Sequence, residues 1–156
     1  MKKVLPILTS RTKKAGFTLI ELLVVIGILA VLLAITLVAI NPARQFAQAN
    51  DTQRQSDVNA ILNGVHQFMA DNNGQRPAGI TTAELTIASG AGNADICNDL
   101  VSDYLAAMPV DPTVGASTAD CTNYTTGYTV LSSADNNRIT VAAPGAEIQA
   151  SISATR

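Results

Sequence analysis

The sequence lacks the residues on which most catalytic sites depend. It has one histidine, His66, two cysteines and no tryptophan in 156 residues. No phosphate-binding loop, zinc cluster or nucleophile paired with a base is recognisable, and a single histidine leaves few options for acid–base chemistry. His66 lies at the border of an apolar stripe, where such residues are ordinarily structural. The sequence therefore predicts no enzyme.

Positive charge is scarce beyond the first sixteen residues. Five of the ten basic residues lie in that short segment, and the rest of the chain has no lysine. Its five arginines stand against twelve acidic residues, a net charge of −7. Such an acidic chain offers no electrostatic footprint for nucleic acid or for anionic lipid headgroups. Nucleic acid is therefore not favoured as a partner.

Charge of either sign is absent from Leu22 to Ile40. As a helix, the apolar stretch from Phe17 to Ile40 would be about 36 Å long, enough to span a bilayer core of about 30 Å. It is longer than the apolar part of a signal peptide, and no small-x-small cleavage site follows it. We expect residues 17–41 to form a membrane-spanning helix rather than a buried core helix. The basic residues before it place residues 1–16 in the cytoplasm and the chain from Asn41 onward outside.

Glu21 is the one acid at the mouth of this apolar segment. Two interpretations stay open. In the first, Thr18 and Glu21 form a capping box, and the acid suits the positive end of the helix dipole. In the second, cleavage after Gly16 frees the amino group of Phe17, and Glu21 of one subunit pairs with that ammonium on a neighbour. Such a pair would fix the register between subunits, because other staggers leave both charges buried alone.

The run Lys14-Ala15-Gly16-Phe17-Thr18-Leu19-Ile20-Glu21-Leu22, followed by the apolar helix, resembles the type IV pilins and pseudopilins. The resemblance covers about the first third of the chain. It implies that a membrane-embedded prepilin peptidase cuts after Gly16 and N-methylates Phe17. It also implies that Glu21 recruits each subunit into a filament. The expected pilin fold is α+β, with a long N-terminal helix packed against a small antiparallel sheet.

Pro42 predicts a break in the long helix, because it has no N–H to donate and disfavours a helical Asn41. Alternatively, it occupies the first turn of a separate helix. Beyond it, residues 42–72 are predicted to form an amphipathic helix. Its apolar stripe recurs at spacings of three and four: Val58, Ile61, Leu62, Val65, Phe68 and Met69.

Residues 73–156 are predicted to form a small extracytoplasmic head. Helical spacing predicts a second helix over residues 95–108. Alternating and β-branched residues predict three antiparallel strands over residues 124–132, 138–143 and 146–153. Because the head is exported, Cys97 and Cys121 are expected to form a disulfide that closes about 25 residues and contributes about 3 kcal/mol. Two free buried thiols are the alternative.

Metal ligation is predicted only weakly. Asp111 and Asp135 could offer oxygens to calcium, and residues 108–112 resemble a loop of the major pseudopilins of type II secretion, some of which bind calcium. The full ligand set of a calcium site is not visible in the sequence. We therefore predict no cofactor, with calcium as the weak alternative.

Together these patterns predict a structural subunit of a type IV pilus-like filament. Its expected partners are its own copies, the prepilin peptidase and an inner-membrane assembly platform. It would sit in the cytoplasmic membrane as a single-pass precursor and then in a cell-surface filament. The alternatives are a pseudopilin of type II secretion and a membrane-anchored binding protein that does not polymerise. A DNA-uptake pilin is less favoured, because no basic patch is present.

Overall fold

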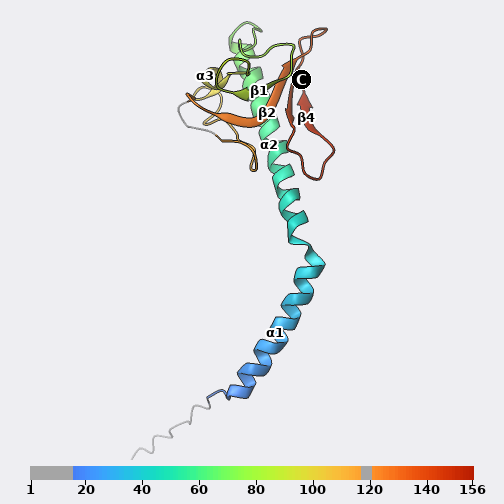
Figure 1. Ribbon diagram of the computed structural model, residues 1–156. Helices are drawn as coiled ribbons and strands as arrows, with labels where there is room; N and C mark the ends of the chain where they lie inside the picture. The colour runs from blue at the N-terminus through green and yellow to red at the C-terminus, as the bar shows by residue number, and fades with distance from the viewer. Residues whose placement is uncertain (1–15, 117–120) are drawn as a thin grey trace, which may run out of the picture. The chain divides into compact units, whose positions relative to one another are not determined.

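The computed structural model describes residues 16–116 and 121–156 (Figure 1). The chain divides into two compact units, Met1–Asn41 and Pro42–Arg156. The predicted leader, residues 1–16, lies outside the described residues apart from Gly16. Four residues of the loop between the cysteines, residues 117–120, also lie outside them.

The described part of the first unit is dominated by one helix, α1 (Leu19–Ile40). Leucine, isoleucine, valine and alanine make up most of it, and none of its 22 residues is buried. By length and composition it is long and apolar enough to cross a membrane. It ends at Asn41, whose φ of 47° is left-handed, a conformation that asparagine tolerates better than most residues.

Helix α2 (Pro42–Asp71) begins at the next residue and belongs to the second unit. Pro42 occupies its first position, where a missing N–H costs nothing. The predicted stripe is confirmed: Val58, Ile61, Leu62 and Val65 are buried, while Phe68 and Met69 pack half-buried against the core. The helix ends where Asn73 and Gly74 take positive φ angles, and the Gly74 N–H donates to the Met69 carbonyl.

A four-stranded antiparallel sheet packs against α2 (Figure 1). Its strands follow in chain order: β1 (Leu85–Ala88), β2 (Thr125–Ser132), β3 (Ile139–Ala143) and β4 (Ile152–Thr155). Alternate residues of β2 and β3 are buried, as expected for a sheet with one covered face. The shared core includes Ile61, Leu62, Val65, Ile87, Tyr128, Val130, Ile139, Val141 and Ile152.

The α+β prediction is confirmed, and so are its strands over residues 124–132 and 138–143. The sheet has four strands rather than three, because the sequence pattern missed the short β1. The strand predicted over residues 146–153 is wrong in its bounds. Residues 146–150 form a loop, because the carboxylate of Asp51 takes up the N–H groups of residues 147–149, and β4 starts only at Ile152.

The second helix, predicted over residues 95–108, is also wrong in its extent. Only α3 (Cys97–Leu100) forms. Ser102 then takes a left-handed φ of 77°, and the N–H of Leu105 turns back to the Leu100 carbonyl. Leu100 is fully buried, so the chain keeps the predicted apolar contact without a long helix.

Candidate functional site

The junction before α1 holds the residues predicted for processing and assembly. Phe17 is 85% exposed, and nothing lies within 4 Å of the position that a side chain on Gly16 would occupy. Gly16 and Phe17 precede the helix without regular structure, and Thr18 is its N-cap. The peptide bond between Gly16 and Phe17 therefore lies between two exposed residues without regular structure, next to a helix start.

Thr18 and Glu21 form the capping box that was one of the two interpretations of the acid. The backbone N–H and the hydroxyl of Thr18 both donate to Glu21 Oε2 at 2.7 Å. The Glu21 N–H returns a bond to Thr18 Oγ1 at 3.2 Å. Within one chain, the carboxylate of Glu21 thus completes the helix start.

The surface of α1 is apolar on all sides. Its leucine, isoleucine and valine side chains are about half exposed or more, reaching 85% at Val38. A helix that is apolar all round is normally covered by lipid or by other helices. The arrangement can therefore insert into a bilayer or pack into a bundle of helices.

A second group of charged and polar side chains lies where α2 first becomes buried and is called here the basal clasp: Asp51, Arg54, Asp111, Thr113 and Glu147. Arg54 is fully buried. Its Nε and Nη2 bind Asp111 as a fork, at 2.7 and 3.1 Å. Its Nη1 donates to Asp51 and Glu147, each at 2.9 Å, and its Nη2 also reaches Thr113 at 2.7 Å.

The carboxylates of the clasp are anchored by backbone groups as well. Asp51 accepts three consecutive N–H groups, those of Glu147, Ile148 and Gln149. Burial alone would raise the pKa of Asp51, but these N–H groups and Arg54 outweigh it and lower that pKa. Burial likewise opposes ionisation of Asp111, yet Arg54 and the N–H groups of Thr113 and Val114 bring its pKa down to about 2.

Glycines leave room for this packing. A side chain on Gly145 would meet Asp111 Oδ2 at 2.9 Å and Arg54 Nη2 at 3.4 Å. One on Gly127 would meet the Asp111 Cβ at 2.8 Å, and Gly127 also has a φ of 79°. The backbone therefore approaches the ion pair as closely as it can at both positions.

The two weak calcium candidates lie apart in the fold. Asp111 is in the clasp, bonded to Arg54, whereas Asp135 is exposed in the turn between β2 and β3. Across residues 16–116 and 121–156, no group of three or more histidine, cysteine or acidic side chains is suited to hold a metal ion. That the protein has no cofactor, with calcium as the weak alternative, stays a prediction.

Sequence reasoning missed the clasp. A signal was present, because Arg54 lies four residues before Val58 and so falls on the stripe that faces the head. An arginine at such a position is almost never buried without acidic partners. Asp51, three residues earlier, was available as one such partner, but the partners from the loops could not be inferred without the fold.

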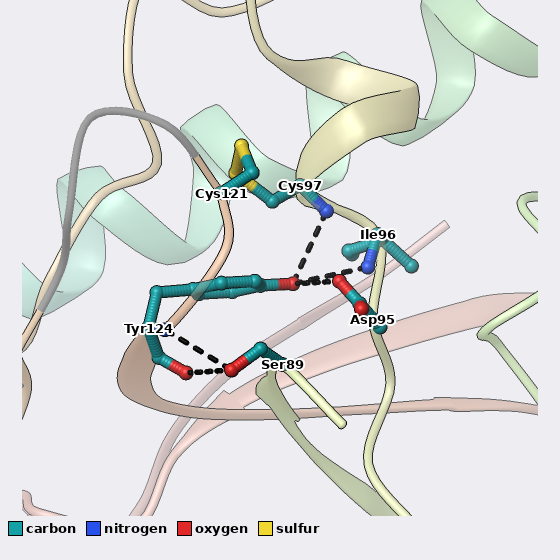
Figure 2. Close-up of a disulfide and its surroundings, with 6 residues drawn as sticks. All are labelled: Ser89, Asp95, Ile96, Cys97, Cys121 and Tyr124. Atoms are coloured by element: carbon teal, nitrogen blue, oxygen red, sulfur yellow. Dashed lines mark hydrogen bonds between the residues drawn. A yellow bond between two sulfur atoms is a disulfide. The ribbon is translucent and has the colours of Figure 1, made fainter. Parts of the chain in front are cut away.

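The disulfide between Cys97 and Cys121 is formed, with Cα atoms 5.5 Å apart (Figure 2). The ring of Tyr124 lies beside it. The Tyr124 hydroxyl accepts the N–H groups of Ile96 and Cys97, each at 3.1 Å, and donates to Asp95 at 2.9 Å (Figure 2). Burial, and then the bond to Asp95, raise the pKa of Tyr124 to about 12. The phenol therefore stays protonated and holds the start of α3.

Comparison with known proteins identifies one region. Residues 11–37, which include the junction and most of α1, match the family model described as the prokaryotic N-terminal methylation motif. No curated protein and no solved structure gives a significant match to the chain. The match covers 27 of the 156 residues and leaves out the head.

Proposed function

We propose that this chain, which carries the prokaryotic N-terminal methylation motif, is the precursor of a structural subunit of a type IV pilus-like filament. The motif supports a pilin-like or pseudopilin-like precursor, and such subunits are typically not enzymes. The observation that carries the proposal is the junction itself: an accessible Gly16–Phe17 bond directly before a capped, fully exposed apolar helix.

Processing is proposed to occur at this bond. A prepilin peptidase would cut after Gly16 and methylate the new amino terminus at Phe17. The exposure of Phe17 and the open space around Gly16 support access to both residues. After the cut, Phe17 is the first residue and directly precedes the N-cap Thr18, so its ammonium group lies next to the positive end of the helix.

Assembly is proposed to proceed through α1. The processed subunit is held in the membrane by this helix and then moves, through an inner-membrane assembly platform, into a bundle of identical helices. Van der Waals packing supplies cohesion in such a bundle. Glu21 gives up its bonds to Thr18 and pairs with the Phe17 ammonium of a neighbour, which sets the stagger between copies. The filament is expected at the cell surface.

A pseudopilin of type II secretion is the second candidate. Residues 108–112, Met-Pro-Val-Asp-Pro, favour it through their resemblance to a loop of the major pseudopilins. The two candidates differ in where the filament ends. Electron microscopy of cells distinguishes them, because a pilus extends from the surface and a pseudopilus stays short within the envelope.

Substitution of Glu21 tests the assembly step. Glu21→Ala is expected to leave a processed subunit in the membrane that enters filaments poorly, and normal filament yield would contradict the charge pair. Thr18→Ala is the matched control, because it weakens the capping box but keeps the carboxylate. If Thr18→Ala lowers filament yield as much as Glu21→Ala does, then Glu21 acts through the helix cap and not through a neighbour.

Substitution of Gly16 tests the processing step. Gly16→Val is expected to block cleavage, because the added side chain obstructs the residue before the cut. N-terminal sequencing of the membrane-bound protein measures the outcome. A mature terminus still found at Phe17 in this variant would rule out the proposed specificity.

A further inference from the structure

The basal clasp joins three segments that lie far apart in the sequence. Asp51 and Arg54 belong to α2, Asp111 and Thr113 to the loop before β2, and Glu147 to the loop between β3 and β4. The loop between β3 and β4 lies beside α2 in Figure 1. We refer to residues 111–114 and 147–149 as the two basal loops. Arg54 bonds to side chains from both of them and from α2.

Each basal loop is held by a carboxylate that Arg54 also binds. Asp51 accepts the N–H groups of Glu147, Ile148 and Gln149. Asp111 accepts those of Thr113 and Val114, at 2.8 and 3.1 Å. The five N–H groups therefore depend on two acids, and the two acids are connected through one guanidinium.

We infer that the basal clasp is a latch that makes the two basal loops open and close against α2 as one unit. Asp51, Arg54 and Asp111 are each at most 2% exposed. If residues 111–114 left with Asp111, Arg54 would stay buried without its bidentate partner. If residues 147–149 left with Glu147, the buried Asp51 would lose its three N–H donors and Arg54 would lose one acceptor. Removing one partner of a buried ion pair is far more costly than removing both, so loss of one loop favours loss of the other.

The position of the latch gives it a mechanical meaning. Residues 42–49 are largely exposed, and Asp51 is the first buried residue of α2. The clasp is thus the first buried point at which α2 is attached to the head. We refer to α1 (Leu19–Ile40) as the stem. In the filament proposed above, on which this consequence rests, neighbours hold the stem, and a pull on the head would reach the stem through α2, to which this latch attaches the head.

Hydrogen exchange on the full chain in detergent micelles tests the coupling. Asp51→Asn removes the charge that holds residues 147–149 but touches no atom of the other loop. We expect the N–H groups of Thr113 and Val114 to lose protection as well, by about 10- to 100-fold, the loss that one charge-assisted bond accounts for. Exchange that speeds up only at residues 147–149 would overturn the latch.

Asp57→Asn is the matched control on the same helix. Asp57 is partly buried and accepts a bond from Tyr128 at 2.8 Å, but it does not bind Arg54. The Asp57→Asn variant is expected to leave the exchange rates of the five N–H groups of the basal loops unchanged. The N–H groups of Ile96 and Cys97, held by Tyr124, report in both variants whether the rest of the head remains folded.

The unaltered chain provides a second measurement if Asp51→Asn fails to fold. At low denaturant, the five N–H groups should share one opening free energy, within about threefold in protection, and one dependence on urea. Protection factors that differ tenfold or more between the two basal loops would overturn the latch. Neither measurement needs a filament, so failure of the latch and failure of the filament proposal are distinguishable, the latter being scored by microscopy.

Discussion

The two units of this chain handle apolar and charged groups in opposite ways. Helix α1 exposes every one of its apolar side chains, whereas the head buries a complete core and an arginine within it. The buried charges of this second unit, Asp51, Arg54 and Asp111, are paired with one another in the basal clasp. In the first unit, none of the described residues, 16–41, is buried, so the stabilisation of α1 must come from lipid or from other copies of the chain. Substitutions in one unit should therefore leave the other unchanged.

The largest expected effect is the loss of the buried cation. Arg54→Ala leaves Asp51 and Asp111 buried without their partner, and we expect the free energy of unfolding of the head to fall by about 3–5 kcal/mol. Urea denaturation in micelles, followed by near-UV circular dichroism of the tyrosines, measures it. The helical signal of α1 should persist after the head unfolds. Arg138→Ala, at an exposed position, is the control, and an equal loss in that variant would contradict a specific role for Arg54.

Removal of the disulfide should rank second. Cys97 and Cys121 are 24 residues apart, and replacing both with serine is expected to lower head stability by about 3 kcal/mol in the chain-entropy model. The same denaturation assay applies, with reduced wild-type protein as the comparison. If full reduction left the urea midpoint unchanged, the disulfide would not stabilise the head by restricting the unfolded chain.

Acid should lower the free energy of unfolding of the head and should leave the apolar helix α1 unaffected. The pKa values of Asp51 and Asp111 are lowered by folding, so their contribution is present above the unfolded value of about 3.9 and is lost as pH falls toward 2. Asp111→Asn should therefore flatten the dependence of head stability on pH between about 5 and 2. A variant curve that runs parallel to the wild type would contradict this assignment.

The smallest effect is expected at the helix start. Thr18→Ala removes the hydroxyl that accepts the Glu21 N–H, and loss of an N-cap typically costs about 1 kcal/mol. Faster hydrogen exchange should be confined to the first turn of α1, near Leu19 to Glu21. Any change in the urea midpoint of the head would show that the two units are coupled after all.

Periodicity and composition were enough to predict the features that depend on one segment alone. The apolar run defined α1, and the spacing of Val58, Ile61, Leu62 and Val65 defined the buried face of α2. Two of the features that sequence patterns missed depend on a distant partner. Residues 146–150 alternate as a strand would, but their backbone donors are taken by Asp51 from α2. The clasp around Arg54 could not be predicted, because two of its three acidic partners come from loops about 60 and 90 residues away.

The bond between Tyr124 and Cys97 has a consequence for how the head matures. Tyr124 follows Cys121 by three residues, and its hydroxyl accepts the N–H of Cys97. The docked phenol therefore ties the segment that carries Cys121 to the backbone of Cys97. We expect the disulfide to form between cysteines whose segments these hydrogen bonds already hold close together. The order of events would then be chain collapse first and covalent closure last.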